Sequence, residues 1–280
     1  MLKQSENRGI PILAYHSVSR EATPRFKPFT VSPELFAEHM DYLHHHAYTT
    51  LTVTQLITML AEARQTFPER VIVITFDDGY ADFFTEALPV LKRYDFTATL
   101  YIVTAFINGT SRWLQREGET MRPMLTWEQV RQLSSLGIEC GGHSHSHRQL
   151  DILPLSMARD EIVRCKHLLE DHLGREVMSF SYPHGYHSNV VKRLVREAGY
   201  TSACAVKYEK NSVTPDPFAL ARLSVDADTS REMFAALLTR TALAPAKNLY
   251  IDMRAAVWRL VRRYSDLVKP EHLQQVDRAV

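Results

Sequence analysis

Short apolar runs of strand length alternate with helix-length amphipathic segments along most of this chain. The clearest run is Val71–Phe76 (VIVITF), a β-branched stretch typical of a strand buried on both faces of a parallel sheet. Repeated strand-then-helix order predicts a parallel sheet with helical crossovers. About seven strands suit a distorted (β/α) barrel better than an open Rossmann sheet. We expect strands at residues 10–15, 71–76, 97–103, 138–141, 178–182, 203–206 and 220–225.

Helical periodicity and end signals predict the crossovers. Ser32 and Pro33 suit the start of a helix, Gly174 suits the end of another, and Pro89 is expected to bend a third. The expected helices cover residues 33–46, 54–64, 81–94, 127–136, 156–173 and 189–198.

After about residue 226 the pattern contains helices only, so we expect a domain of residues 1–226 and a helical extension of residues 227–280 packed on it. Within the extension, residues 257–268 (VWRLVRRYSDLV) form a basic amphipathic segment. Such a helix usually packs its apolar stripe on the domain, and the alternative is peripheral contact with an anionic membrane surface.

Composition excludes several functions. Lys and Arg number 33 against 32 Asp and Glu, so the basic surplus that nucleic-acid binding requires is absent. No apolar run reaches the roughly 18 residues of a membrane span. The N-terminus lacks the apolar core of a secretory signal. We therefore expect a cytoplasmic location if Met1 is the native start, and a periplasmic or extracellular one if an export signal has been removed.

Carboxylates and histidines must carry the chemistry. The signatures of P-loop, dinucleotide-binding, zincin and serine-hydrolase enzymes are absent, and three dispersed cysteines form no zinc motif. Asp77 and Asp78 directly follow the strand Val71–Phe76, at the strand end where α/β enzymes place their sites. One carboxylate could bind a metal while the other acts as a base. The alternative is a plain Asp-Asp-Gly turn.

A histidine cluster, GGHSHSH, follows another short strand. In an extended chain His143 and His147 would lie about 13 Å apart, too far for one ion. In a turned chain they would lie about 6 Å apart, within reach of one metal, with His145 pointing elsewhere. Two imidazoles and one carboxylate suit zinc, and also cobalt, nickel or iron. Such an ion would polarise a carbonyl and lower the pKa of a bound water, which describes amide or ester hydrolysis.

Two further segments concern substrate. Residues 180–185 (FSYPHG) follow a strand, and a backbone N–H in this turn could stabilise an oxyanion. Residues 108–123 form the one long candidate loop, a lid or a substrate rim that carries Trp113. We expect Tyr182, Pro183 and Trp113 to bind substrate.

Together these motifs resemble the polysaccharide deacetylases of carbohydrate esterase family 4, over about residues 8–226. Residues 75–79 are similar to the family's TFDDG motif and residues 143–147 to its H-[ST]-x-x-H motif. The resemblance implies a distorted (β/α)7 barrel. It implies Asp77 as catalytic base, with Asp78, His143 and His147 as ligands of a divalent metal, most simply zinc.

The segment around Tyr15 and His16 resembles the start of poly-N-acetylglucosamine deacetylases, which implies His16 as a general acid. Ser181 stands where many members carry the arginine that orients the base. Arg222 stands where the late LxH motif has its histidine, and is a possible orienter of Asp77. His184 replaces a tyrosine, and offers both an oxyanion donor and a second candidate acid.

The resemblance implies a metal-dependent hydrolase that removes N-acetyl groups from an N-acetylhexosamine-containing polysaccharide or glycoconjugate. An O-acetyl ester or non-sugar amide hydrolase on the same scaffold is an alternative. A glycan-binding protein without turnover is another.

Overall fold

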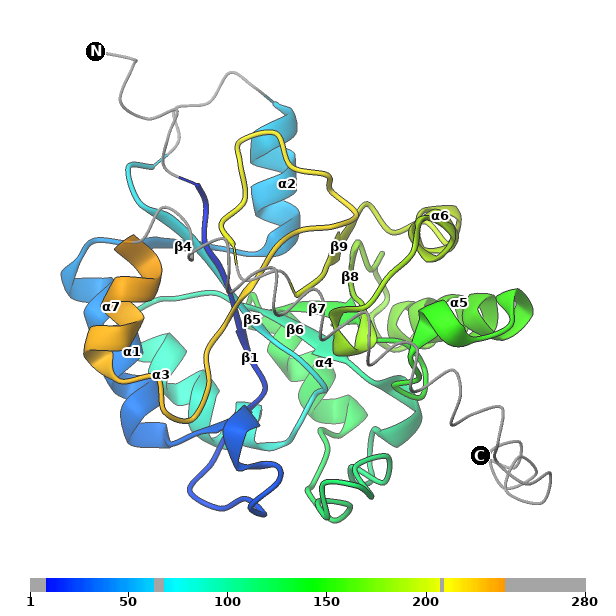
Figure 1. The fold of residues 1–280 in the computed structure, drawn as a ribbon, viewed down its shortest axis with the longest axis horizontal. Helices are drawn as coiled ribbons and strands as arrows, with labels where there is room; N and C mark the ends of the chain where they lie inside the picture. Colours follow the sequence, from blue (N-terminus) through cyan, green and yellow to red (C-terminus); the bar gives the residue numbers. More distant parts are fainter. Residues whose placement is uncertain (1–8, 63–67, 207–208, 240–280) are drawn as a thin grey trace. The chain divides into compact units, whose positions relative to one another are not determined.

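Eight of the described strands form one parallel sheet that curves around an apolar interior, with helices outside it (Figure 1). The computed structural model describes residues 9–62, 68–206 and 209–239. Its main strands are β1 (Ile12–Tyr15), β4 (Thr49–Leu51), β5 (Val71–Phe76), β6 (Thr99–Ile102), β7 (Glu139–Gly142), β8 (Ser179–Ser181), β9 (Ser202–Cys204) and β10 (Leu223–Ser224).

The order of the strands shows how the sheet closes into a barrel. Neighbours follow the order β10-β1-β5-β6-β7-β8-β9, and β4 pairs with β5 outside this path. A parallel bridge between Cys204 and Leu220 joins the two ends of this order, because Leu220 lies just ahead of β10. The predicted distorted (β/α)7 barrel is confirmed.

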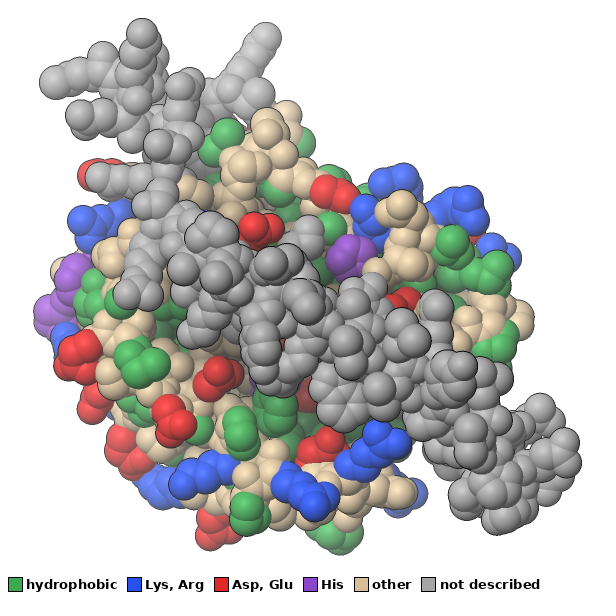
Figure 2. Space-filling view, viewed as in Figure 1, with side chains coloured by type: hydrophobic (Ala, Val, Ile, Leu, Met, Phe, Trp, Pro, Cys, Tyr) green, Lys and Arg blue, Asp and Glu red, His purple; other side chains and the backbone are tan. Residues whose placement is uncertain are grey.

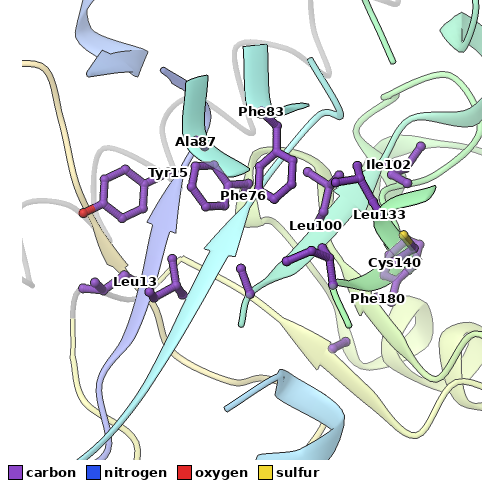
Figure 3. Packing of buried hydrophobic residues seen from close by; sticks show 14 of the residues in the cluster. Leu13, Tyr15, Phe76, Phe83, Ala87, Leu100, Ile102, Leu133, Cys140 and Phe180 are labelled. Atoms are coloured by element: carbon purple, nitrogen blue, oxygen red, sulfur yellow. The ribbon is translucent and has the colours of Figure 1, made fainter. Parts of the chain in front are cut away.

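Alternating side chains divide the core into two clusters. Along β5, Val71 and Val73 belong to an inner cluster with residues of β1, β6 and β9. The intervening residues of β5 pack outward against the helices, where Figure 3 shows Phe76 against Phe83, with ring centroids 4.7 Å apart. This period of two continues through Thr75 to Asp77, which therefore project inward above the apolar layer.

One helix closes the barrel at the ends where the strands begin. The helix α2 (Val53–Ala61) adds Val53 and Leu56 to the inner cluster. The backbone N–H of Val53 donates to Thr99 Oγ1 at the start of β6 (2.9 Å), and Thr54 donates to the Glu139 carboxylate at the start of β7. The functional end of the barrel is therefore the opposite one.

The predicted helices form with small shifts at their ends. Ser32 caps the first helix by accepting from the Leu35 N–H, and Thr126 with Gln129 forms a capping box. Gly174 takes the left-handed conformation (φ +64°) that ends the longest described helix. The remaining bounds are α1 (Pro33–His45), α4 (Trp127–Ser135), α5 (Leu155–Leu173) and α6 (Asn189–Glu197).

The segment at residues 81–94 differs from the single helix predicted for it. A π-helical turn, Phe83–Ala87, precedes α3 (Leu88–Arg93), and the Leu88 N–H donates to the Phe83 carbonyl. Pro89 has no N–H for the residue 85 carbonyl, so the regular ladder is interrupted there. The disturbance predicted at Pro89 takes the form of a π-helical turn directly before α3.

Three short strands were not predicted. The strands β2 (Ser17–Val18) and β3 (Thr30–Val31) form a separate parallel pair, and β4 has three residues. Two or three residues are too few to show a hydrophobic period. The pair β2 and β3 nevertheless fixes the path of the chain directly after β1.

The first part of the predicted extension packs on the domain. In α7 (Arg231–Thr239), Phe234 stacks on His39 of α1, with ring centroids 4.2 Å apart. Residues 257–268 lie outside the described residues, and the boundary at residue 226 stays a prediction. None of the described helices is both long and apolar enough to cross a bilayer.

His39 links α1, β1 and the turn before α7. Tyr15 Oη lies 3.0 Å from His39 Nδ1, and His39 Nε2 lies 2.7 Å from the Thr229 carbonyl oxygen. A neutral ring with the proton on Nε2 satisfies both bonds. Burial lowers the pKa of His39 to about 4.

This burial predicts a pH dependence of stability. Between pH 6.5 and pH 4 the unfolded chain binds a proton at His39 that the folded chain does not, so the free energy of unfolding falls as pH falls. The lowered pKa corresponds to about 3 kcal/mol over this window. Denaturant titrations of the wild type and His39→Gln at both pH values measure it as their difference. The exposed His45→Gln serves as control. If the free energy of unfolding changed equally between the two pH values in all three proteins, the prediction would be contradicted.

Candidate metal centre and active site

Three strand ends bring the candidate site together. Asp77 and Asp78 follow β5, His143 follows β7, and Ser181 ends β8. Asp77 is tied to the neighbouring strand because its N–H donates to the Tyr15 carbonyl (3.0 Å).

The two glycines ahead of the histidine cluster lie inside β7 rather than helping the chain to leave it. A Cβ at Gly141 would stand 2.7 Å from the Tyr101 ring, and one at Gly142 would stand 2.3 Å from Tyr200 Oη. These positions therefore require glycine because two tyrosines pack against the strand.

The histidine cluster takes the turned form. His147 has φ +60°, its N–H donates to Ser144 Oγ (3.0 Å), and its ring centroid lies 5.0 Å from that of His143. Both imidazoles face Asp78, whose Oδ1 lies 3.5 Å from His143 Nε2 and 3.2 Å from His147 Nε2. His145 instead bonds Thr104 Oγ1 (2.9 Å), away from the pair.

Asp78, His143 and His147 form the only group of potential metal ligands found among the described residues. Among the residues that the structure describes, none forms a hydrogen bond with the buried Oδ1 of Asp78. Tetrahedral bonds of 2.0–2.1 Å would set neighbouring ligand atoms about 3.3 Å apart, and the two distances to Asp78 Oδ1 lie on either side of this. The donor set and its spacing therefore fit a divalent cation such as zinc.

Two outer contacts orient these ligands. His143 Nδ1 lies 2.8 Å from the Ser181 carbonyl oxygen, so its proton sits on Nδ1 and Nε2 is left as a ligand atom. Tyr80 donates from Oη to Asp78 Oδ2 (2.6 Å). Burial raises the pKa of Asp78 to about 6 and lowers the pKa of His143. Both shifts express the cost of burying a charge, and a cation would offset that cost for Asp78.

Asp77 is paired with a fully buried arginine. Arg222 Nη1 and Nη2 each donate to one Asp77 oxygen at 2.7 Å. The other three N–H groups reach Thr75 Oγ1, Ser181 Oγ and the Ala205 carbonyl. Burial alone raises the pKa of Asp77, but the charge of Arg222 and its hydrogen bonds outweigh it, so the pKa lies well below its usual range.

The orienting arginine reaches Asp77 from a different strand than the family motif implies. Ser181 stands at the motif position on β8, and its hydroxyl accepts from Arg222 Nη2 at 2.9 Å. Arg222, just ahead of β10, supplies the guanidinium instead. The structure thus brings the two departures from the family pattern into one contact.

The two candidate acids have different neighbours. His16 is half-buried and packs its ring edge on Phe29 (5.3 Å). Burial lowers the pKa of His16, while the charges of Asp77 and Asp78 raise it. His184 is exposed in a left-handed conformation (φ +60°), with its ring 4.7 Å from that of His147.

The expected substrate residues occupy different environments. Tyr182 is buried and donates from Oη to the Phe218 carbonyl (2.9 Å), and Pro183 is buried beside it. Trp113 lies near the ligands, with its rings 5.5 Å from His147 and 6.2 Å from Tyr80. Of the three, the structure places Trp113 at the rim and the side chains of Tyr182 and Pro183 within the domain.

Sequence reasoning missed one residue that contacts a candidate ligand and one buried residue of the loop beside the site. Tyr80 follows the TFDDG motif directly, so its proximity to Asp78 was a possible signal. Arg122 ends the long loop, and nothing in its sequence context marks it as buried.

Loss of the Tyr80 hydroxyl should weaken metal binding. Tyr80→Phe leaves Asp78 Oδ2 without its donor, and outer contacts of this kind contribute roughly 10–100-fold to metal affinity. Zinc affinity is measured by competition with a chromophoric chelator. Tyr94→Phe, which removes only a long contact to Asp41 (3.4 Å), should bind zinc as the wild type does. Equal affinity in all three proteins would refute the role of Tyr80.

Arg222 should stabilise the fold through Asp77. Arg222→Met leaves a buried carboxylate unpaired and should lower the free energy of unfolding by about 3–5 kcal/mol. The double variant Asp77→Asn, Arg222→Met should recover part of this loss. Urea denaturation measures Arg222→Met, Asp77→Asn and the double variant, and strictly additive losses would argue against direct coupling.

The geometry agrees with comparisons to known proteins. A polysaccharide deacetylase family model matches residues 64–203. YxkH of Bacillus subtilis (strain 168) is 28% identical over 237 residues, which cover 85% of this chain and 78% of that protein. Poly-beta-1,6-N-acetyl-D-glucosamine N-deacetylase of Escherichia coli (strain K12) is 21% identical over 307 residues, which cover 98% of this chain but only 43% of that protein.

A solved structure shares the fold. The Streptococcus pyogenes deacetylase PplD, in complex with acetate, has a TM-score of 0.71 at 22% identity, covering 83% of this chain and 99% of that one. Because the family model spans half of the 280 residues, this chain belongs to the polysaccharide deacetylase family.

Proposed function

We propose that this chain is a divalent-metal-dependent N-deacetylase that acts on an N-acetylhexosamine-containing polysaccharide or glycoconjugate. One observation carries the proposal: a carboxylate held ionised by a buried arginine lies beside a separate three-ligand set. The E. coli relative is named for N-deacetylation of poly-beta-1,6-N-acetyl-D-glucosamine, which supports an acetamido sugar as substrate.

Asp78, His143 and His147 would hold the metal, most simply zinc. When bound, the ion would polarise the acetamide carbonyl and make water more acidic. Three protein ligands leave coordination open for substrate, as in catalytic rather than structural zinc sites.

Asp77 is the base in this proposal. Its Oδ2 lies 3.9 Å from His143 Nε2, so the carboxylate borders the ligand set without belonging to it. Pairing with Arg222 keeps Asp77 ionised and fixes its plane, so an oxygen is available to take the proton of the attacking water. Arg222 is thus a positioning residue.

We assign the proton donor to His16. Burial lowers the pKa of His16 and the charges of Asp77 and Asp78 only partly offset this, so a protonated His16 ring would readily give its proton to the leaving amine. His184 is exposed on the His147 side, where its backbone N–H is the candidate oxyanion donor. Trp113 offers an apolar surface for a sugar ring at the same side.

Asp77→Asn should lower acetate release from N-acetylglucosamine oligomers by at least about 100-fold, because the base is lost. Metal affinity should remain close to that of the wild type, since Asp77 is outside the ligand set. The assay uses metal-stripped protein restored with zinc, cobalt or nickel, and an O-acetylated oligomer runs beside the N-acetylated panel. Full activity of the variant would exclude Asp77 as base. Release from the O-acetylated oligomer alone would favour an esterase.

A further inference from the structure

A buried arginine lies under the rim of the site, although the mechanism above does not use it. The side chain of Arg122 is only 8% exposed. The other basic residues in the loop after β2 and in the long loop after β6 are exposed. Figure 2 shows Lys and Arg side chains along the lower edge of the face that it draws. These exposed residues are Arg20, Arg25, Lys27, Arg112 and Arg116.

Arg122 connects three separate segments through its guanidinium. Nη1 donates to Ser17 Oγ (3.0 Å) on β2 and to Asp82 Oδ2 (3.1 Å) after β5. Nη2 donates to the Glu21 carbonyl (2.7 Å) and to Glu119 Oε1 (2.7 Å). A buried cation facing two carboxylates is thus shared by the loop after β2, the turn after β5 and the long loop after β6.

The long loop is held on its other side as well. Glu119 Oε2 accepts from the Thr23 N–H (2.8 Å), and Thr23 Oγ1 donates to the Glu117 carbonyl (2.8 Å). With both loops bonded to each other and to Arg122, this segment is a fixed rim rather than a free lid.

The guanidinium also supports the aromatic residues of the rim. Arg122 Cζ lies 4.9 Å from the Phe26 ring centroid and 5.9 Å from that of Tyr80. Phe26 contacts Phe29 (5.8 Å), and Tyr80 contacts Trp113 (6.2 Å).

Phe29 and Trp113 each contact a histidine of the candidate site. Phe29 is 41% exposed and packs on His16, the proposed acid. Trp113 packs on His147, a proposed metal ligand. One aromatic side chain therefore borders His16 and another borders His147, and Arg122 contacts the neighbour of each.

We propose that Arg122 is a positioning residue that holds Phe29 and Trp113 at a fixed separation, so that they bind sugar rings on the two sides of the acetamide being hydrolysed. The proposal rests on the proposed function, and it identifies the substrate as a glycan with sugar units on both sides of the reacting residue. Lysine could keep the charge of Arg122 but could not span four acceptors in one plane.

The experiment compares Arg122→Lys and Arg122→Gln with the wild type on an N-acetylglucosamine pentamer and on the monosaccharide. For the pentamer we expect KM to rise about tenfold in both variants while kcat stays within about threefold. This pattern is expected when a lost contact had stabilised the bound substrate and the transition state equally. For the monosaccharide, which cannot reach both rings, the kinetic constants should not change. The exposed Arg159→Gln, which loses an ion pair with Glu197, is the matched control.

A second readout needs no activity. The chain has three tryptophans, so Trp127→Phe with Trp258→Phe isolates Trp113 fluorescence. Arg122→Lys should increase acrylamide quenching of Trp113, because the ring is no longer held. Glu119→Gln, which weakens the same contact more mildly, should do so to a smaller extent and serves if the Arg122 variants do not fold.

The outcomes separate the two proposals. Wild-type KM and wild-type quenching in the Arg122 variants, even with a lower Tm, would overturn the positioning role. A KM effect of Arg122→Lys that persists in a Phe29→Ala, Trp113→Ala background would also overturn it, because the rings would not transmit the effect. If the wild type released no acetate from any oligomer, the proposed function would fail, and Trp113 quenching would still decide the role of Arg122.

Discussion

The buried pair of Asp77 and Arg222 is the interaction on which the rest of the site depends. One guanidinium places all five of its N–H groups, on Thr75 and Asp77 of one side of the barrel and on Ser181 and Ala205 of the other. It therefore joins the end of β5 to the ends of β8 and β9 across the interior. The Ser181 carbonyl oxygen also accepts from His143 Nδ1, so Ser181 connects Arg222 to one of the candidate ligands.

This arrangement separates two carboxylates that are adjacent in sequence. Asp77 faces a permanent positive charge and has a lowered pKa, whereas Asp78 has a raised pKa and a buried oxygen that forms no hydrogen bond within the described part of the chain. The first is held ionised, and the second faces two imidazoles with which it could share a cation. The different roles proposed for them thus follow from their neighbours, and the left-handed backbone of Asp78 (φ +78°) turns the two side chains apart.

Much of the fold could be predicted from the sequence, because periodicity and end signals act locally. The run Val71–Phe76 forms β5 with the predicted bounds, and Ser32 and Gly174 mark helix ends as expected. The short pair β2 and β3 could not be predicted, because its pairing joins segments separated by a loop. The π-helical turn before Pro89 was likewise hidden, since a proline signal does not specify how a helix adjusts.

The candidate site was predictable where a motif is compact in sequence and hidden where it is assembled across strands. Asp78, His143 and His147 lie in two short motifs and do come together in the structure. Arg122 gave no signal, because its four acceptors come from residues 17, 21, 82 and 119. Tyr182 was expected at the substrate, but its hydroxyl is occupied by the Phe218 carbonyl, a contact that only the fold reveals.

The position of α2 bears on how substrate and products would enter and leave the barrel. Among the described residues, Val53 and Leu56 pack with the apolar side chains of the strands where the strands begin. On the proposed function, sugar, water and the released acid would all enter and leave at the opposite end, beside Phe29 and Trp113. An acetate ion that lingers near the ligands would therefore compete with the next substrate for the same entrance.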